Sequence, residues 1–300
     1  MQFVVVLVLA FAPGIFWLWM VYRRDRYRPE PRALVVRTFL WGMVVAIPVA
    51  LLEFVLVFLV DPGAIDAIQD GPLSLATAAY VSFVAAGVTE ELGKYIVVRR
   101  TVYHSPYFDE PMDGIVYASA AALGFASLEN LGYLLAFGWE TILVRGPVST
   151  LAHVLFSVMW GYPLGLSKAT KGGLRTWVWL GVIGAMVAHG LFDFLLFIEG
   201  VYSYLTIPLF LAAGASFVLM MRRAQRLSPY REMIGDLLVG CPDCGIKVPY
   251  HADFCTSCGV SLREARRNAS VFCGKCGAAL NHEVEYCTSC GSRLLRKPPR

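Results

Sequence analysis

Seven apolar stretches dominate this sequence and restrict it to one class of fold. Each is about 20 residues long, the length that an α-helix needs to cross a hydrocarbon core of about 30 Å. Charged residues make up 16% of the chain and the mean hydropathy is +0.59, whereas a soluble domain is typically about 25% charged. The sequence therefore predicts an all-α, polytopic membrane protein with about seven transmembrane helices. The predicted spans are 1–22, 34–60, 73–98, 114–137, 148–166, 177–198 and 205–221.

The basic residues of the loops between these stretches predict how the chain is oriented. Loops that would face the cytosol contain fourteen Lys and Arg residues, and loops on the opposite side contain one, Arg145. Such an excess marks cytoplasmic loops. The first stretch has no basic residues ahead of it and no small-residue cleavage site, which indicates a retained helix and not a signal peptide. We expect a multi-pass protein of the cell membrane, surrounded by lipid, with its N-terminus outside and its C-terminus in the cytosol.

All eight cysteines lie after residue 240, in four Cys-x-x-Cys pairs. Ten residues separate the two pairs of each unit, and the second unit repeats the first at an offset of 32 residues. Four thiolates suit a closed tetrahedral Zn²⁺ site. A disulfide framework is the alternative, but cytosolic thiols stay reduced. We predict two structural zinc sites, formed by Cys241, Cys244, Cys255 and Cys258 and by Cys273, Cys276, Cys287 and Cys290.

The cysteine units define the expected domain organisation. It comprises a membrane domain (1–225), a linker (226–240), a first zinc ribbon (241–260), a second linker (261–272) and a second ribbon (273–293). The tail from residue 241 holds nine Lys and Arg against five Asp and Glu. Each Zn(Cys)₄ centre adds about −2, because its thiols ionise, and this cancels the basic excess. Nucleic-acid binding is therefore disfavoured, and we expect a protein partner to dock on the ribbons.

Charged side chains within the spans are costly, so each requires a partner or a function. In the third span, Glu90 and Lys94 are four residues apart, on one helix face, where they can pair. Glu91 projects about 100° away, toward a different neighbour. Two adjacent carboxylates in a low-dielectric interior suit general acid–base chemistry or a metal site. The alternative is that Glu91 and Lys94 only mark the cytosolic end of the helix.

The next three spans also contain polar residues. Glu129 and Asn130 lie well inside the fourth span, where a lone glutamate could equally be a proton relay or a packing residue. His153 is the only strongly polar side chain of its apolar stretch, and alone it is more typical of a hydrogen-bonded packing histidine. His189 and Asp193 are four residues apart. That spacing suits two metal ligands, one ligand with its orienting carboxylate, or a structural pair.

Together these residues form an ordered set of motifs on four successive spans: Glu-Glu-x-x-Lys, Phe-x-x-x-Glu-Asn, an isolated His and His-Gly-x-x-Asp. The set resembles the PrsW family of intramembrane proteases, distant relatives of the CAAX-prenyl protease and of bacteriocin-processing membrane proteins. The resemblance implies a peptidase that cleaves a membrane-anchored, single-span protein. The best-known role in the family is the first-site cleavage of an anti-sigma factor. The ribbon tail lies outside this resemblance.

The resemblance also implies roles for individual residues. Glu90 and Glu91 would supply the catalytic carboxylate. One further divalent metal, most naturally Zn²⁺, would activate water, unless the Glu and His side chains do so without a metal. The residues that would hold this metal or water are Glu129, His153 and His189, with Lys94, Asn130 and Asp193 in supporting positions.

Two other functions fit the same polar residues. A proton-coupled transporter also uses intramembrane Glu, His and Asp, but the spans show no internal repeat of the kind that transporters often have. A non-enzymatic scaffold would recruit partners through the ribbons, but the complete motif set argues against it. The protease hypothesis also requires a particular geometry, because Glu90 and Glu129 lie at different predicted depths in the membrane. Convergence requires the third helix to extend past Arg100 or the fourth to begin deeper than Asp113.

Overall fold

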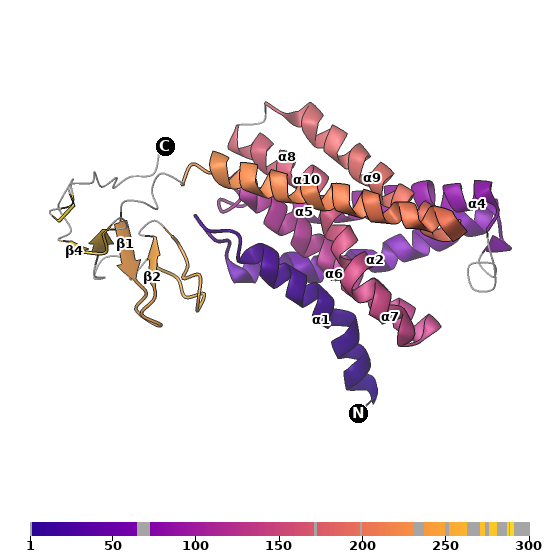
Figure 1. Ribbon diagram of the computed structural model, residues 1–300, viewed down its shortest axis with the longest axis horizontal. Helices are drawn as coiled ribbons and strands as arrows, with labels where there is room; N and C mark the ends of the chain where they lie inside the picture. Colours follow the sequence, from indigo (N-terminus) through magenta and orange to yellow (C-terminus); the bar gives the residue numbers. More distant parts are fainter. Residues whose placement is uncertain are drawn as a thin grey trace.

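The structure, a computed structural model, combines a helical bundle with a small β-sheet that carries the cysteines beside one end of the bundle (Figure 1). We call this end the ribbon end; α1 (Gln2–Tyr22) ends there and α6 (Pro111–Phe137) begins there. The structure describes residues 2–64, 73–170, 173–198, 200–230, 237–249, 252–262, 271–273, 276–280, 287 and 289–290.

The remaining helices follow the predicted apolar stretches. One continuous helical run, from α4 through α5, contains a π-helical segment, η1, immediately before Thr89. A second π-helical segment, η2, leads into α8. The other elements are α2 (Arg32–Val60), α4 (Leu75–Ala79), η1 (Tyr80–Val88), α5 (Thr89–Thr101), α7 (Glu140–Val144), η2 (Arg145–Ser149), α8 (Thr150–Ala169), α9 (Arg175–Phe197), the 3-10 helix η3 (Gly200–Leu205) and α10 (Thr206–Leu227).

Five helical segments among the described residues are long and apolar enough to cross a membrane, so the predicted count of seven is not confirmed. The other two predicted spans are also helical: most of 73–98 is divided among α4, η1 and α5, and most of 148–166 lies on α8. Large apolar side chains of α2 and α10 are exposed, as lipid-facing helices require. The five segments are Val4–Tyr22, Arg32–Val60, Pro111–Phe137, Arg175–Phe197 and Gly200–Leu227.

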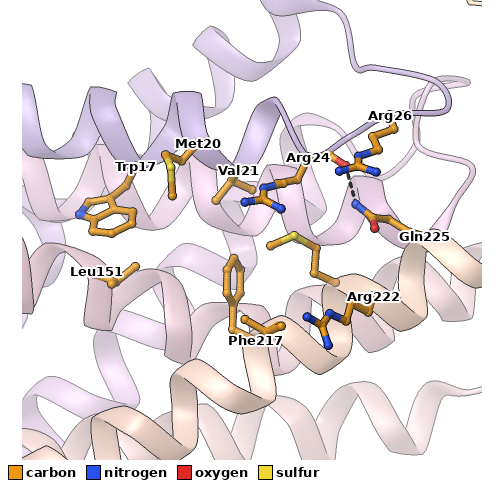
Figure 2. A pocket seen from close by; sticks show the side chains of 11 residues that line it. Trp17, Met20, Val21, Arg24, Arg26, Leu151, Phe217, Arg222 and Gln225 are labelled. Atoms are coloured by element: carbon orange, nitrogen blue, oxygen red, sulfur yellow. Dashed lines mark hydrogen bonds between the residues drawn. The ribbon is translucent and has the colours of Figure 1, made fainter.

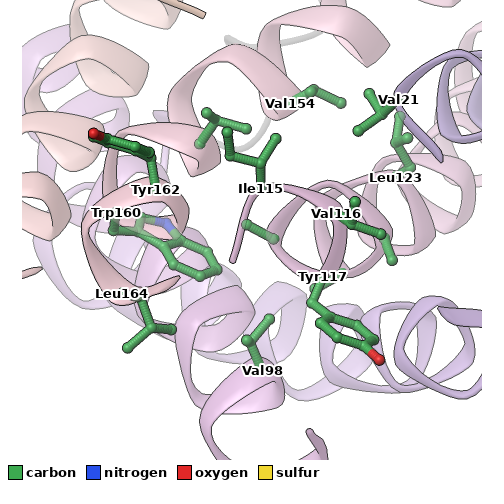
Figure 3. Packing of buried hydrophobic residues seen from close by; sticks show 14 of the residues in the cluster. Val21, Val98, Ile115, Val116, Tyr117, Leu123, Val154, Trp160, Tyr162 and Leu164 are labelled. Atoms are coloured by element: carbon green, nitrogen blue, oxygen red, sulfur yellow. The ribbon is translucent and has the colours of Figure 1, made fainter. Parts of the chain in front are cut away.

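Helix α6 forms the centre of the bundle, and its residues are almost all buried as far as Ser127. Its small residues let neighbouring helices approach closely. A Cβ atom on Gly114 would overlap the backbone of Gly161 in α8, so these two helices touch through their main chains. Around this contact, Ile115 of α6 and Trp160 of α8 belong to one buried apolar cluster (Figure 3). The packing fixes α8, and with it His153, against α6.

The sheet joins the two cysteine units. Its antiparallel strand order is β2-β1-β3-β4, and the central β1–β3 pair connects one unit to the other. Strand β1 begins at Leu237, within the predicted linker 226–240, and β3 begins within the predicted linker 261–272. The strands are β1 (Leu237–Gly240), β2 (Lys247–Pro249), β3 (Val271–Cys273) and β4 (Ala279–Leu280).

The first cysteine unit contacts the ribbon end of the bundle directly. Arg28, in the turn after α1, pairs with Asp253 at 2.8 Å, and the Arg32 guanidinium donates a hydrogen bond to the Ser257 carbonyl at 2.7 Å. The rings of Tyr107 and Phe254 lie 5.8 Å apart. The ribbon is therefore docked on the membrane domain by charged and aromatic contacts.

A cavity of about 520 Å³ lies between α1, α8 and α10 (Figure 2). The amide of Gln225 donates a hydrogen bond to the Arg24 carbonyl at one end of it. None of the polar residues predicted for the active site lines it. This cavity is therefore separate from the cluster described next. Its lining runs from apolar side chains, including Trp17, Leu151 and Phe217, to Arg24, Arg26 and Arg222.

Candidate active site and zinc centres

Polar side chains of four helices meet inside the bundle, and we call this group the Glu/His cluster. Its centre is the ammonium of Lys94, which is fully buried and donates to Glu90 Oε2 and to Glu91 Oε1, both at 2.9 Å. Glu90 and Lys94 therefore pair as their spacing predicts, and Glu91 shares the same cation. The cluster consists of Glu90, Glu91 and Lys94 on α5, Glu129 on α6, His153 on α8, and His189 and Asp193 on α9.

His153 links the carboxylates of α5 and α6. Its Nδ1 lies 2.9 Å from Lys94 Nζ and 3.6 Å from Glu90 Oε2, and its Nε2 lies 3.0 Å from Glu129 Oε2. Helix α5 ends at Thr101, and α6 begins at Pro111. Neither helix is therefore shifted along the bundle by much. The His153 imidazole instead spans the distance between Glu90 and Glu129.

His189 approaches the same carboxylates from α9. Its Nδ1 lies 3.1 Å from Glu91 Oε1, and its Nε2 lies 3.7 Å from Glu90 Oε2 and 3.5 Å from Asp193 Oδ2. The neighbouring Gly190 makes this approach possible, because a Cβ atom there would lie only 2.8 Å from the Cα of Phe83 in η1. The absence of a side chain on Gly190 therefore brings His189 to the two glutamates.

Glu91 and Glu90 have different surroundings although they are adjacent. Glu91 Oε2 accepts hydrogen bonds from Ser157 Oγ at 2.8 Å and from Trp160 Nε1 at 2.9 Å, while its Oε1 faces Lys94 and His189. Both carboxylate oxygens of Glu91 therefore have partners inside the bundle. Such a carboxylate orients its partners.

Glu129 and Asp193 form the accessible edge of the cluster. Their side chains are 23% and 24% exposed, against 6% for Glu90 and 4% for His153 and His189. Glu129 Oε1 accepts a hydrogen bond from Arg145 at 2.6 Å. These two carboxylates therefore form the least buried side of the cluster.

Several contributing residues were not predicted. Arg145, assigned to an outer loop, pairs with Glu129, and Ser157 and Trp160 hold Glu91. Glu53 accepts a hydrogen bond from Thr89 Oγ1 at 3.1 Å, one residue before Glu90. It is the only acidic residue of α2, and a lone acid in an apolar helix is a signal that could have identified it.

Asn130, predicted to support the site, braces helices. Its amide donates to Thr150 Oγ1 at 2.9 Å and to the Ala10 carbonyl at 3.5 Å. These bonds tie α6 to α8 and α1 one residue away from Glu129. Asn130 therefore acts on the position of the helix that carries Glu129.

Three members of the cluster match the ligand set of a catalytic metal. One atom each of Glu90, His153 and His189 lies within 4.8 Å of the other two, and all three side chains are buried. One carboxylate and two imidazoles form a known catalytic zinc set, and ligands at about 2.1 Å around one ion lie about 3.4 Å apart. The cluster also has more acids than permanent cations, since Lys94 and Arg145 are the only Lys or Arg side chains of the described residues that pair with its acids. The residues present therefore fit a divalent cation.

The cysteines form two tetrads. Sγ atoms lie 3.5 Å apart in the pairs Cys241–Cys258 and Cys244–Cys255, and 3.6 to 3.7 Å apart in the corresponding pairs of the second unit. Four sulfurs at about 2.3 Å from a tetrahedral zinc are about 3.8 Å apart. The structure shows no disulfide bond among the eight cysteines, all of which lie in the described residues, and this argues against the disulfide framework. Gly245, Gly259 and Gly277 have a positive φ, as the tight turn after a Cys-x-x-Cys pair requires. The two predicted structural zinc sites are confirmed.

Comparison with known proteins gives the same assignment for both parts of the chain. The model of the PrsW family intramembrane metalloproteases matches residues 30–214, and the double zinc ribbon model matches residues 241–292. Protease PrsW of Geobacillus kaustophilus is 36% identical over 193 residues, which cover 64% of this chain and 80% of the relative. Protease PrsW of Bacillus subtilis is 33% identical over 198 residues, which cover 66% and 85%. No solved structure matches the chain.

These comparisons confirm the predicted enzyme class. A family that consists of metalloproteases also favours a metal at the Glu/His cluster over metal-free catalysis, and it favours the protease over the transporter and the scaffold. The chain belongs to the PrsW family of intramembrane metalloproteases and carries a double zinc ribbon after its membrane domain.

Proposed function

We propose that the Glu/His cluster hydrolyses a peptide bond of a membrane protein and that Glu90, His153 and His189 hold the catalytic metal. This set replaces Glu129 of the sequence-based expectation with Glu90. The observation that carries the proposal is the convergence of two imidazole nitrogens on one oxygen, Glu90 Oε2, at 3.6 and 3.7 Å. A divalent zinc ion there would polarise the scissile carbonyl and lower the pKa of a bound water to about 7.

Glu129 is then available to move protons. Its Oε1 is held by Arg145, and its Oε2, a buried atom, lies 3.0 Å from His153. Glu129 would accept a proton from the attacking water and deliver it to the amide nitrogen. The carbon–nitrogen bond then breaks and releases a carboxylic acid, which keeps the second proton of the water, and an amine. General acid–base catalysis of this kind contributes about 10²- to 10⁴-fold to a rate.

Glu91 and Lys94 are positioning residues in this scheme. Glu91 Oε1 accepts from His189 Nδ1, which leaves Nε2 for the metal. Lys94 lies 2.9 Å from Glu90 Oε2 and from His153 Nδ1, two of the atoms that would bind the metal. Metal binding and this ammonium would therefore compete for the same lone pairs, and Lys94 holds them together until the metal arrives.

The substrate would be a single-span membrane protein of the anti-sigma-factor type, cut within or near the bilayer. The excess of basic residues at the ribbon end supports an orientation with the zinc ribbons in the cytosol and the N-terminus outside. A cytosolic partner would then meet the ribbons, where the first already contacts the membrane domain through Asp253. Protease digestion of sealed right-side-out cells tests this orientation; the ribbons should be protected.

A two-stage experiment tests the proteolytic function. Membrane proteomes of cells that carry the wild-type chain and cells that carry Glu90→Gln are compared, and a single-span protein should accumulate uncut in the variant. That protein is then reconstituted in liposomes with the purified full-length enzyme, and the products are identified by mass spectrometry.

A matched variant controls for changes unrelated to the site. Glu140→Gln alters an exposed acid at the start of α7 and should cleave at the wild-type rate. Full cleavage by Glu90→Gln, or the absence of any protein that accumulates uncut, would overturn the proposal.

A further inference from the structure

A second group of buried carboxylates lies at the ribbon end, outside the Glu/His cluster and the ribbons. Asp25 belongs to the turn after α1, Glu110 precedes α6, and Asp113 lies in the first turn of α6. One carboxylate oxygen of each lies within 4.8 Å of an oxygen of the other two. All three residues are at most 3% exposed. We call this group the ribbon-end cluster.

Main-chain hydrogen bonds fix two of its carboxylates. Asp113 Oδ2 accepts from the backbone N–H groups of Asp109 and Glu110, both at 2.7 Å. Asp25 Oδ2 accepts from the backbone N–H of Glu30 at 3.3 Å. The main chain thus holds one oxygen of each aspartate, and this fixes the position of the second oxygen as well.

The remaining oxygens lack a partner that neutralises them. Asp25 Oδ1 and Asp113 Oδ1 are buried without a hydrogen bond, and the Glu110 carboxylate, also buried, faces the backbone N–H of Asp113 in the capping box at the start of α6. No Lys, Arg or His of the described chain forms an ion pair with any of these three residues; Arg28, on the same turn as Asp25, pairs with Asp109 and Asp253. Buried charges without a partner are strongly unfavourable.

The local electrostatics agree with a missing positive charge. Burial raises the pKa of Asp25 well above its usual range, and the neighbouring Glu110 and Asp113 raise it further. Burial and the charge of Asp109 raise the pKa of Glu110 to about 7. A cation bound between these carboxyl groups would favour their ionised forms over the neutral ones.

We propose that Asp25, Glu110 and Asp113 form a binding site for a hard divalent cation, Ca²⁺ or Mg²⁺. The site offers only oxygen donors, which these ions prefer, and it lacks the sulfur and nitrogen donors typical of zinc. Such a cation ties the turn after α1 to the start of α6. It lies beside the contact between Arg28 and Asp253, and so it stabilises the surface on which the first ribbon docks.

Calorimetric titration of the full-length protein in detergent, with Ca²⁺ and with Mg²⁺ after treatment with a chelating resin, tests this site. The wild-type chain should bind one equivalent saturably and unfold at a higher temperature when loaded. Asp113→Asn and Glu110→Gln should each weaken binding at least about tenfold, because ligand charge sets affinity in such sites. Glu140→Gln, which lies outside the cluster, should bind like the wild type.

A further readout separates lost binding from lost folding. Without divalent cations, Asp113→Asn and Glu110→Gln should unfold at or above the wild-type temperature, because each removes a repulsive buried charge. Three results would overturn the proposal: no saturable binding by the wild type, unchanged binding in both variants, or uptake of zinc alone.

Discussion

In the Glu/His cluster, Glu90 and Glu91 share the ammonium of Lys94 and Glu129 pairs with Arg145, whereas the carboxylates of the ribbon-end cluster have no basic partner among the described residues. The first group is held in a defined arrangement by the chain's own cations, so its residues can be positioned for chemistry before any substrate or metal binds. The ribbon-end cluster would depend on a cation that the protein binds from solution. In our proposals, the chain's own cations partly neutralise the first cluster before a catalytic metal binds, whereas the second relies on a bound cation alone.

Removal of the carboxylate shared by both histidines should have the largest effect. Glu90→Gln takes away a metal ligand and one partner of Lys94, so cleavage of a reconstituted single-span substrate should fall to background. Circular dichroism should show unchanged helix content. Wild-type turnover by this variant would show that Glu90 is not needed for catalysis, and the proposed difference in role between the two clusters would be lost.

Loss of the proposed proton carrier should come next. Glu129→Gln keeps the shape of the side chain but cannot accept a proton, and kcat should fall about 10²- to 10⁴-fold. KM should change little, because the residue acts on the reacting bond. A loss confined to KM would mean that Glu129 contacts substrate without moving a proton.

Lys94→Met should make the first cluster resemble the second. It leaves Glu90 and Glu91 buried without their ammonium, and breaking a buried pair in this way costs about 3–5 kcal/mol of stability. Thermal unfolding in detergent measures the loss. If Lys94→Met is as stable as the wild type, the internal cation is not what holds the cluster together.

The orienting carboxylate should matter less than the ligand beside it. Glu91→Gln can still accept from Trp160 and Ser157 but binds His189 less strongly, and activity should fall about 10- to 100-fold, as for other residues that orient metal ligands. Initial rates at several zinc concentrations measure the effect, and added zinc should restore part of the activity. Inactivation as complete as that of Glu90→Gln would instead favour Glu91 as the catalytic carboxylate.

The contact between the ribbon and the bundle should give the smallest change. Asp253→Asn weakens a partly exposed ion pair with Arg28, for which about 0–1 kcal/mol is typical. Hydrogen exchange of the β1–β2 strands should rise slightly while cleavage stays unchanged. A large loss of cleavage would show that ribbon docking controls the active site.

Much of this arrangement was predictable from the sequence, because polar residues are rare in apolar helices. The helices that carry Glu129, His153 and His189 lie close to the expected ranges, and the cysteine spacing predicted both tetrads. The Glu and His residues could be identified because polar side chains are costly inside a bilayer.

The division of roles was not predictable. The spacing of Glu90 and Glu91 says that they face different directions but not which one meets both histidines; that depends on the π-helical segment before Thr89 and on the close approach of α9 at Gly190. Arg145 looked like a loop residue because its partner, Glu129, is sixteen positions away. Of the ribbon-end acids, Glu110 and Asp113 are neighbours in the sequence, and Asp25 joins them only through the packing of α1 on α6.

Zinc analysis of the purified full-length protein tests the central claim most directly. The wild-type chain should contain three equivalents of zinc, two in the cysteine tetrads and one in the Glu/His cluster. A His153→Ala/His189→Ala variant should contain two and should not cleave substrate. A fully active wild-type chain with only two equivalents, or three equivalents retained in the double variant, would contradict the assignment of Glu90, His153 and His189 as the catalytic metal ligands.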